Sequence, residues 1–182
     1  MHYWASPPWS LALTETQSLR IRPATPGDCA DVLRFIRALA EYERLLHKVT
    51  ATESDLRQTL FGDIPAAEAL IAEWKGHPAG FCLFFPNYST FLARPGIYLE
   101  DLYVDPRYRG LGIGKNLLAY LARLTVERGG SRLDWSVLDW NSMAIEFYRT
   151  IGARALSEWT QFRLESEPLE RLAQSGLTRS SP

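Results

Sequence analysis

The sequence predicts one α/β domain, of the α+β kind, in which helices flank a mixed β-sheet in the order β-α-α-β-β-β-α-β-α-β. Three observations predict it. Short apolar runs with period-two alternation indicate strands, and apolar residues at helical spacing behind capping residues indicate helices. One strand also runs into a glycine-rich turn that opens a helix. The chain has 182 residues, enough for one domain with a core and too short for two comfortable ones.

The first half of this domain is predicted as a strand, two helices and a β-hairpin. A strand is expected at 19–22, before Pro23. Two capping patterns predict helices reaching about Leu46 and Leu60: Thr25-Pro26-Gly27-Asp28 and Thr52-Glu53-Ser54-Asp55. Two apolar runs, 69–74 and 80–85, are joined by Lys75-Gly76-His77-Pro78 and predict a hairpin. The segment 86–96 is expected to be a loop.

The second half is organised around Ile97–Lys115, a strand that leads into the turn and its helix. That helix is expected from Gly114 to about Arg128, before Gly129-Gly130. The remaining elements, in order, are a strand at 133–137, a helix capped by Asn141-Ser142 and ending at Gly152, a last strand at 159–164, and a polar tail or short helix at 168–177. The expected boundaries are a poorly ordered extension at 1–18, the domain at 19–166 and a tail at 167–182.

Composition and charge restrict the function. The formal net charge of −1 argues against a nucleic-acid partner, because binding a phosphate backbone depends on a basic surface. Cys29 and Cys82 are expected to be unbridged thiols in a reducing compartment, since two cysteines do not make a disulfide framework. The first eighteen residues lack a basic n-region and are interrupted by Pro7-Pro8. We therefore expect no signal peptide, no membrane partner and a cytoplasmic location.

The glycine-rich turn, Arg109-Gly110-Leu111-Gly112-Ile113-Gly114-Lys115, indicates a site for a phosphorylated ligand. Glycines let backbone N–H groups approach an anion, and a helix N-terminus adds positive partial charge. The spacing fits neither a P-loop, which needs GxxxxGK followed by Ser or Thr, nor a dinucleotide-binding GxGxxG in a βαβ unit. A turn without a ligand is the alternative.

The pattern R-x-x-G-x-G in this element order resembles the acyl-CoA-binding motif of the GNAT superfamily of N-acetyltransferases. Further blocks resemble its diamine acetyltransferase family, which includes the spermidine/spermine N-acetyltransferases and the thialysine N-epsilon-acetyltransferases. They are I-R-P-A-T-x-x-D-C, Y-E in the first helix, Y-L-E-D-x-Y-V, D-W-N and F-Y-x-x-x-G-A. The resemblance covers Ile21 to about Leu164. It implies a GNAT fold with a mostly antiparallel sheet, acetyl-CoA as the acetyl donor, a small amine as acceptor, and a homodimer.

The resemblance also implies site residues. The cofactor would be bound by backbone groups along the strand, by the turn and by a second helix N-terminus: Leu102, Tyr103, Val104, Arg109, Gly110, Leu111, Gly112, Ile113, Gly114, Lys115, Asn141, Ser142, Met143 and Ala144. The amine would be bound by Tyr42, Glu43, Glu100, Asp134, Trp135 and Ser136. Salt-bridged or solvated surface positions are the alternative for the carboxylates, and core packing is the alternative for Trp135. No residue is assigned to a metal.

Tyr148 and Glu100 are the predicted catalytic residues. Tyr148 matches the family's proton donor to the leaving thiolate, and packing beside Phe147 is its alternative role. An alkyl amine is protonated at neutral pH, so its attack needs a base. Glu100 is the candidate, directly or through water, as base or only as an amine ligand. Asp101 is expected on the opposite face of a regular strand, which a bulge would change.

Two departures from the family pattern bear on the acceptor. Where polyamine-acetylating members carry an acid and a tryptophan, this chain has Thr90 and Leu92, which is closer to the thialysine type. The segment 155–159 is also shorter, so carrying a substrate acid onto Glu158 is unsupported. The predicted activity is direct acetyl transfer to a diamine, polyamine or lysine-like amine. An enzyme acting on a protein or peptide amine and a non-catalytic acyl-CoA-binding module remain alternatives.

Overall fold

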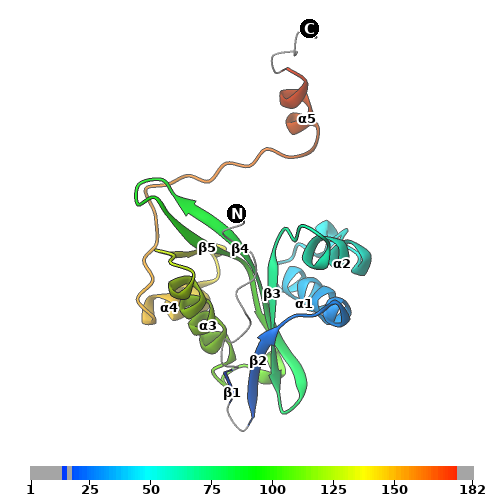
Figure 1. Cartoon of the computed structure of the whole chain (residues 1–182), viewed down its shortest axis with the longest axis vertical. Helices are drawn as coiled ribbons and strands as arrows, with labels where there is room; N and C mark the ends of the chain where they lie inside the picture. The colour runs from blue at the N-terminus through cyan, green and yellow to red at the C-terminus, as the bar shows by residue number, and fades with distance from the viewer. Residues whose placement is uncertain (1–13, 16–17, 176–182) are drawn as a thin grey trace. The chain divides into compact units, whose positions relative to one another are not determined.

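The computed structural model describes residues 14–15 and 18–175, which divide into two compact units between Ser136 and Val137 (Figure 1). Six described strands of the first unit form one sheet in the order β1-β2-β3-β4-β5-β6. The antiparallel strands are β1 (Thr14–Glu15), β2 (Leu19–Pro23), β3 (Glu68–Trp74), β4 (His77–Ser89) and β5 (Arg94–Val104), whereas β6 (Leu133–Trp135) runs parallel to β5. The predicted fold class, a mixed and mostly antiparallel sheet flanked by helices, is confirmed.

Three longer helices and three short 3₁₀ turns complete the described part of this unit. The helices are α1 (Cys29–Tyr42), α2 (Glu53–Phe61) and α3 (Ile113–Glu127), and the turns are η1 (Pro26–Asp28), η2 (Leu46–Lys48) and η3 (Pro106–Tyr108). α1 and α2 cover one face of the sheet and α3 covers the other (Figure 1). The second unit contains α4 (Ser142–Thr150) and α5 (Ser166–Gln174).

The strands alternate between the two covered faces, and this alternation builds the core. On the α1 face, Phe81 stacks on Phe35 with ring centroids 5.5 Å apart, and Ile71 and Tyr103 join the same buried cluster. The intervening strand residues, such as Cys82 and Phe84, point to the other face, where the apolar residues of α3 are buried. Both cysteines are buried and free, as expected from the sequence.

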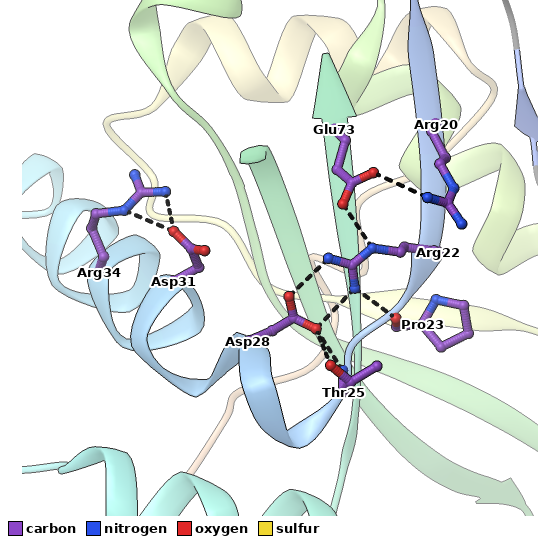
Figure 2. A network of polar contacts seen from close by, with 8 residues as sticks. All are labelled: Arg20, Arg22, Pro23, Thr25, Asp28, Asp31, Arg34 and Glu73. Atoms are coloured by element: carbon purple, nitrogen blue, oxygen red, sulfur yellow. Dashed lines mark hydrogen bonds and ion pairs between the residues drawn. The ribbon is translucent and has the colours of Figure 1, made fainter. Parts of the chain in front are cut away.

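A charged network joins β2, β3 and the start of α1 (Figure 2). The Arg22 guanidinium donates two hydrogen bonds of 2.8 Å to the Asp28 carboxylate, and its Nε donates to Glu73 Oε1 at 2.8 Å. Asp28 Oδ2 also accepts from the backbone N–H and the hydroxyl of Thr25, both at 2.7 Å. The predicted cap at Thr25 is therefore present, and it also fixes β2 against the first helix.

Two predicted elements were wrong. The segment 86–96 is mostly strand, because pairing continues from Pro86↔Ile97 to Ser89↔Arg94 and leaves only 90–93 as a loop. Gly96 lies inside β5 and does not end a turn. It permits a close approach, since a Cβ at this position would lie 2.8 Å from the Arg132 carbonyl oxygen.

The last strand predicted at 159–164 has no regular secondary structure. Trp159 and Phe162 are 70% and 89% exposed. Alternating apolar residues predict a strand only where a neighbouring strand supplies hydrogen bonds, and no such pairing forms here among the described residues. The prediction for 1–18 lies mostly outside the described residues, apart from the short strand β1. No described helix is long and apolar enough to cross a membrane.

Candidate active site

The centre of the candidate site is a β-bulge at Glu100. Leu83 pairs with Asp101 and the next residue, Phe84, pairs with Leu99, so Glu100 has no partner on β4. Cross-strand partners share a face. Asp101 therefore lies with Leu83 on the α1 face, whereas Leu99 lies with Phe84 on the α3 face. In a regular strand the side chains of Leu99 and Asp101 would share one face, so the bulge is what directs Asp101 toward α1.

Three carboxylates interact electrostatically around this bulge. Burial, with the nearby charges of Glu100 and Glu43 as further causes, raises the pKa of Asp101 to about 6. Glu43 follows the last residue of α1, and burial raises the pKa of its carboxyl as well. Glu100 itself is exposed. Every contribution to the Asp101 shift disfavours its negative charge, so the first unit holds a partly buried acidic group suited to a cation.

The edge of β5 that faces β6 loses its strand partner at the bulge. Parallel pairing with β6 ends at Leu99↔Trp135, but pairing with β4 continues to Gly80↔Val104. Leu102, Tyr103 and Val104 therefore have a strand partner on one edge only among the described residues. Such an edge can accept an extended ligand that adds to the sheet through main-chain hydrogen bonds. This is the arrangement that the predicted pantetheine contacts of these three residues require.

The glycine-rich turn follows directly. Gly110 and Gly112 have φ angles of 77° and 78°, in the left-handed region that favours glycine. Gly112 is the N-cap of α3 and provides no side-chain cap, so the first-turn N–H groups of the helix point out of its end. Leu111, Ile113, Gly114 and Lys115 complete this segment. Its geometry suits an anion such as a pyrophosphate.

The predicted amine-binding residues in and after β6 contact other residues of the protein. Asp134 Oδ2 accepts a 2.7 Å hydrogen bond from Asn87 Nδ2 and lies 2.8 Å from Arg132 Nε. The Ser136 hydroxyl lies 2.8 Å from the Tyr98 hydroxyl. Trp135 is half-buried opposite Leu99. The structure therefore gives Asp134 a cationic partner of its own, whereas Glu43 and Glu100 act electrostatically on Asp101.

The other predicted residues belong to the second unit. Asn141 caps α4 by accepting a 3.3 Å hydrogen bond from the Ala144 N–H, and Ser142 and Met143 form the exposed first turn. Tyr148 is half-buried with its ring centroid 5.5 Å from that of Phe147, and burial raises its pKa. Gly152, with φ 87°, ends the helix as predicted, because its N–H donates to the Arg149 carbonyl.

Sequence reasoning gave Asp101 no role. Its acidic neighbour Glu100 was assigned because it matches a family position, and alternation then placed Asp101 on the other face. Only the register between β4 and β5 shows that this alternation breaks at Glu100. Two adjacent acids in an otherwise apolar strand were the available signal, since a buried carboxylate inside a strand needs an explanation.

A mixed, mostly antiparallel sheet with a bulged strand that leads into a glycine-rich helix start is the arrangement expected of an acyl-CoA-dependent acyltransferase. The chain belongs to the acetyltransferase (GNAT) family, whose family model matches residues 36–153. Enzymes of this family use acetyl-CoA as the acetyl donor.

The chain is 44% identical to thialysine N-epsilon-acetyltransferase of Sus scrofa, over 86% of this chain and 98% of that protein. It is 34% identical to L-ornithine N5-acetyltransferase NATA1 of Arabidopsis thaliana, over 84% of this chain and 87% of that protein. Among solved structures, it resembles an integron cassette protein from the mobile metagenome of V. cholerae, with a TM-score of 0.74 and 27% identity, over 87% of this chain and 99% of that chain. These similarities confirm the predicted family and its acetyl donor.

Proposed function

We propose that this protein transfers the acetyl group of acetyl-CoA to a primary amine of a small diamine, polyamine or lysine-like amino acid. The observation that carries the proposal is the set of three carboxylates at the β5 bulge. Glu100 and Asp101 lie on the strand that leads into the glycine-rich turn, and Glu43, at the end of α1, acts electrostatically on Asp101. A cationic acceptor would relieve the repulsion among these groups. The names of the similar proteins, which act on thialysine and ornithine, support an acceptor of this size and charge.

In the proposed reaction, the neutral amine nitrogen attacks the thioester carbonyl carbon directly. The C–N bond forms, the C–S bond breaks, the nitrogen loses a second proton as the amide forms, and the thiolate takes a proton. Glu100, directly or through water, takes the proton that the ammonium must lose, and Asp101 and Glu43 hold the cationic form of the acceptor before attack. An unperturbed lysine-like amine has a pKa of about 10.4, so deprotonation on the enzyme is required at neutral pH.

Tyr148 is proposed as the proton donor to the leaving thiolate. The support is the match of F-Y-x-x-x-G-A to the family motif and the burial that raises the pKa of this phenol, which keeps it protonated at neutral pH. Tyr148→Phe tests the role. We expect kcat to fall by about 10²-fold, the usual contribution of a positioned acid. Wild-type turnover across the pH range would remove Tyr148 from this role.

Cofactor binding is proposed for the backbone of Leu102–Val104, for Arg109–Lys115 and for Asn141–Ala144. The amides along β5 would hold pantetheine and the acetyl oxygen, and the first-turn N–H groups of α3 would hold the pyrophosphate. Titration of the full-length protein with CoA measures this binding directly.

The acceptor is identified by following release of free CoA thiol with acetyl-CoA and a panel of amines. The panel contains thialysine, lysine, ornithine, putrescine, spermine and a peptide with a free N-terminus. The proposal expects the highest kcat/KM with one of the small amines. Preference for the peptide would indicate a protein-directed enzyme, and tight acetyl-CoA binding without thiol release from any amine would indicate a non-catalytic binding module.

A homodimer and a cytoplasmic location are further parts of the proposal, and both rest on the family resemblance and the composition. Light scattering of the purified protein measures its mass directly. A monomer at micromolar concentration, with full activity, would contradict the dimer.

A further inference from the structure

Arg109, the first residue of the glycine-rich turn, contacts more than the turn. Its Nε donates a 3.1 Å hydrogen bond to the Val104 carbonyl at the end of β5. Its guanidinium carbon also lies 5.4 Å from the ring centroid of Tyr42 and 5.8 Å from that of Tyr103. Both distances are within the range of cation–π contacts. One side chain thus joins the turn to the last residue of α1.

The Tyr42 end of α1 is also the acceptor side of the proposed site. Glu43 is the next residue and acts electrostatically on Asp101. Tyr103 is 9% exposed and packs against Phe35 with ring centroids 6.0 Å apart, so its ring is a fixed surface for the guanidinium. Tyr42 is the more exposed of the two rings that contact the guanidinium. Any change that orders Arg109 will therefore act mainly on Tyr42.

The backbone next to Arg109 makes that ordering sensitive to a ligand. Gly110 and Gly112 hold the turn in left-handed conformations, and the side chain of Arg109 is exposed apart from the three contacts above. An anion bound by the turn restricts this arginine through charge and through the fixed backbone. An arginine suits this role because its planar guanidinium can stack on rings and donate a hydrogen bond at the same time.

We propose that Arg109 is a positioning residue that couples cofactor binding in the turn to amine binding at the bulge, acting through the ring of Tyr42. The inference rests on the proposed function and assigns Arg109 a role beyond contact with the cofactor. Coupling between two binding sites is reciprocal. Bound cofactor therefore raises the affinity for the amine by the same factor by which bound amine raises the affinity for the cofactor.

The experiment measures this factor by calorimetry with CoA, which cannot be turned over, and thialysine. For the wild type, we expect CoA to lower the Kd of thialysine by about fivefold or more, in the usual range of such coupling. Arg109→Lys keeps the charge but loses the Nε donor and the planar stack, so the factor should fall below about twofold. If Arg109→Lys weakens CoA binding and leaves the coupling factor unchanged, Arg109 is a cofactor ligand only and the inference is wrong.

Two Tyr42 variants test the same contact from the other side. Tyr42→Phe keeps the ring and should keep the coupling, whereas Tyr42→Leu should lose it without weakening CoA binding in the absence of amine. In Arg109→Lys/Tyr42→Leu, the loss should be no larger than in either single variant. Additive losses would show that the two residues act independently and would overturn the inference. Thermal unfolding verifies that each variant is folded. If Arg109→Lys is not folded, the comparison of Tyr42→Phe with Tyr42→Leu tests the inference by itself.

Arg107→Lys is the matched control. Arg107 lies two residues away, is 73% exposed, and pairs with Asp105 at 2.7 Å. Arg107→Lys replaces the same guanidinium by an ammonium, but at a residue for which no contact with Tyr42 or Val104 is described. The coupling factor of this variant should therefore match that of the wild type. Acetyl-CoA turnover with the amine panel separates the two proposals. Absence of turnover in the wild type would contradict the proposed function, whereas normal turnover with unaltered coupling in Arg109→Lys would contradict only this inference.

Discussion

Asp28 and Asp101 are both largely withdrawn from solvent in the same unit, yet their surroundings shift their pKa values in opposite directions. Asp28 accepts hydrogen bonds from Arg22 and Thr25 (Figure 2), and these partners lower its pKa to about 2. Asp101 lies beside Glu100 and Glu43, and burial with this repulsion raises its pKa to about 6. One carboxylate has its counter-charge within the chain. The other lacks one among the described residues and is suited to a cation from outside.

The difference separates residues that stabilise the fold from residues that serve a ligand. A partnered carboxylate contributes stability, whereas a charged group held without a partner costs stability and is a candidate functional residue. On this basis, substitution at Asp28 and at Asp101 should change different properties. The following predictions test that separation in order of expected size.

The largest expected effect is on activity at Asp101. Asp101→Asn keeps the shape of the side chain but removes the charge that we propose holds the ammonium. We expect kcat/KM for the preferred amine to fall by about 100-fold, with CoA binding unchanged. Steady-state kinetics and calorimetry measure the two quantities. Asp28→Asn is the control, and its kcat/KM should stay within about threefold of wild type if the protein is folded. A similar loss in both variants would remove the distinction.

The next effect is on stability at Asp28. Asp28→Asn removes the charge that the Arg22 guanidinium pairs with, and a shift of nearly two pKa units corresponds to about 2–3 kcal/mol in the free energy of unfolding. Urea unfolding at pH 7 measures the loss. Arg34 and Asp31 form an exposed pair at 2.7 Å on the same helix, so Asp31→Asn is a matched control. It should cost no more than about 1 kcal/mol.

The third prediction concerns the pH dependence of stability, which should have opposite signs at Asp101 and Asp28. The folded pKa of Asp101 is above its ordinary value of 3.8, so its charge destabilises the fold as pH rises from about 4 to about 6. Asp101→Asn should therefore match wild type near pH 4 and exceed its stability by about 2–3 kcal/mol at pH 7. The folded pKa of Asp28 is below 3.8, so its contribution is lost only as pH falls toward 2. The deficit of Asp28→Asn should be constant between pH 5 and 8. A constant difference for Asp101→Asn over pH 4–7 would contradict its raised pKa.

The same comparison explains what the sequence could predict. Elements that depend on local chemistry were predicted well: the caps at Thr25 and Thr52, the hairpin turn at Lys75-Gly76, and the glycine that ends a helix at Gly152. The environment of Asp101 depends on the register between β4 and β5, and a one-residue shift at Glu100 changes which face it occupies. The strand expected at 159–164 failed for a related reason. Its apolar residues are present, but strand formation needs a partner that local sequence does not specify.

The smallest expected effect is at Asp134, where the role predicted from the sequence disagrees with the contacts in the structure. The sequence predicts a role in amine binding, but its carboxylate accepts from Asn87 Nδ2 at 2.7 Å and pairs with Arg132 Nε at 2.8 Å. If internal partners decide a carboxylate's role, Asp134→Asn should lower stability by less than about 1 kcal/mol, since an amide oxygen can still accept from both donors and the pair is partly exposed. The amine KM should stay within about twofold of wild type, as measured by steady-state kinetics with the preferred acceptor. Ala at the same position removes the acceptor altogether and should cost more stability, again without changing the amine KM. A tenfold rise in amine KM for Asp134→Asn would instead place Asp134 with Asp101, because a carboxylate can then pair with Arg132 and still bind substrate.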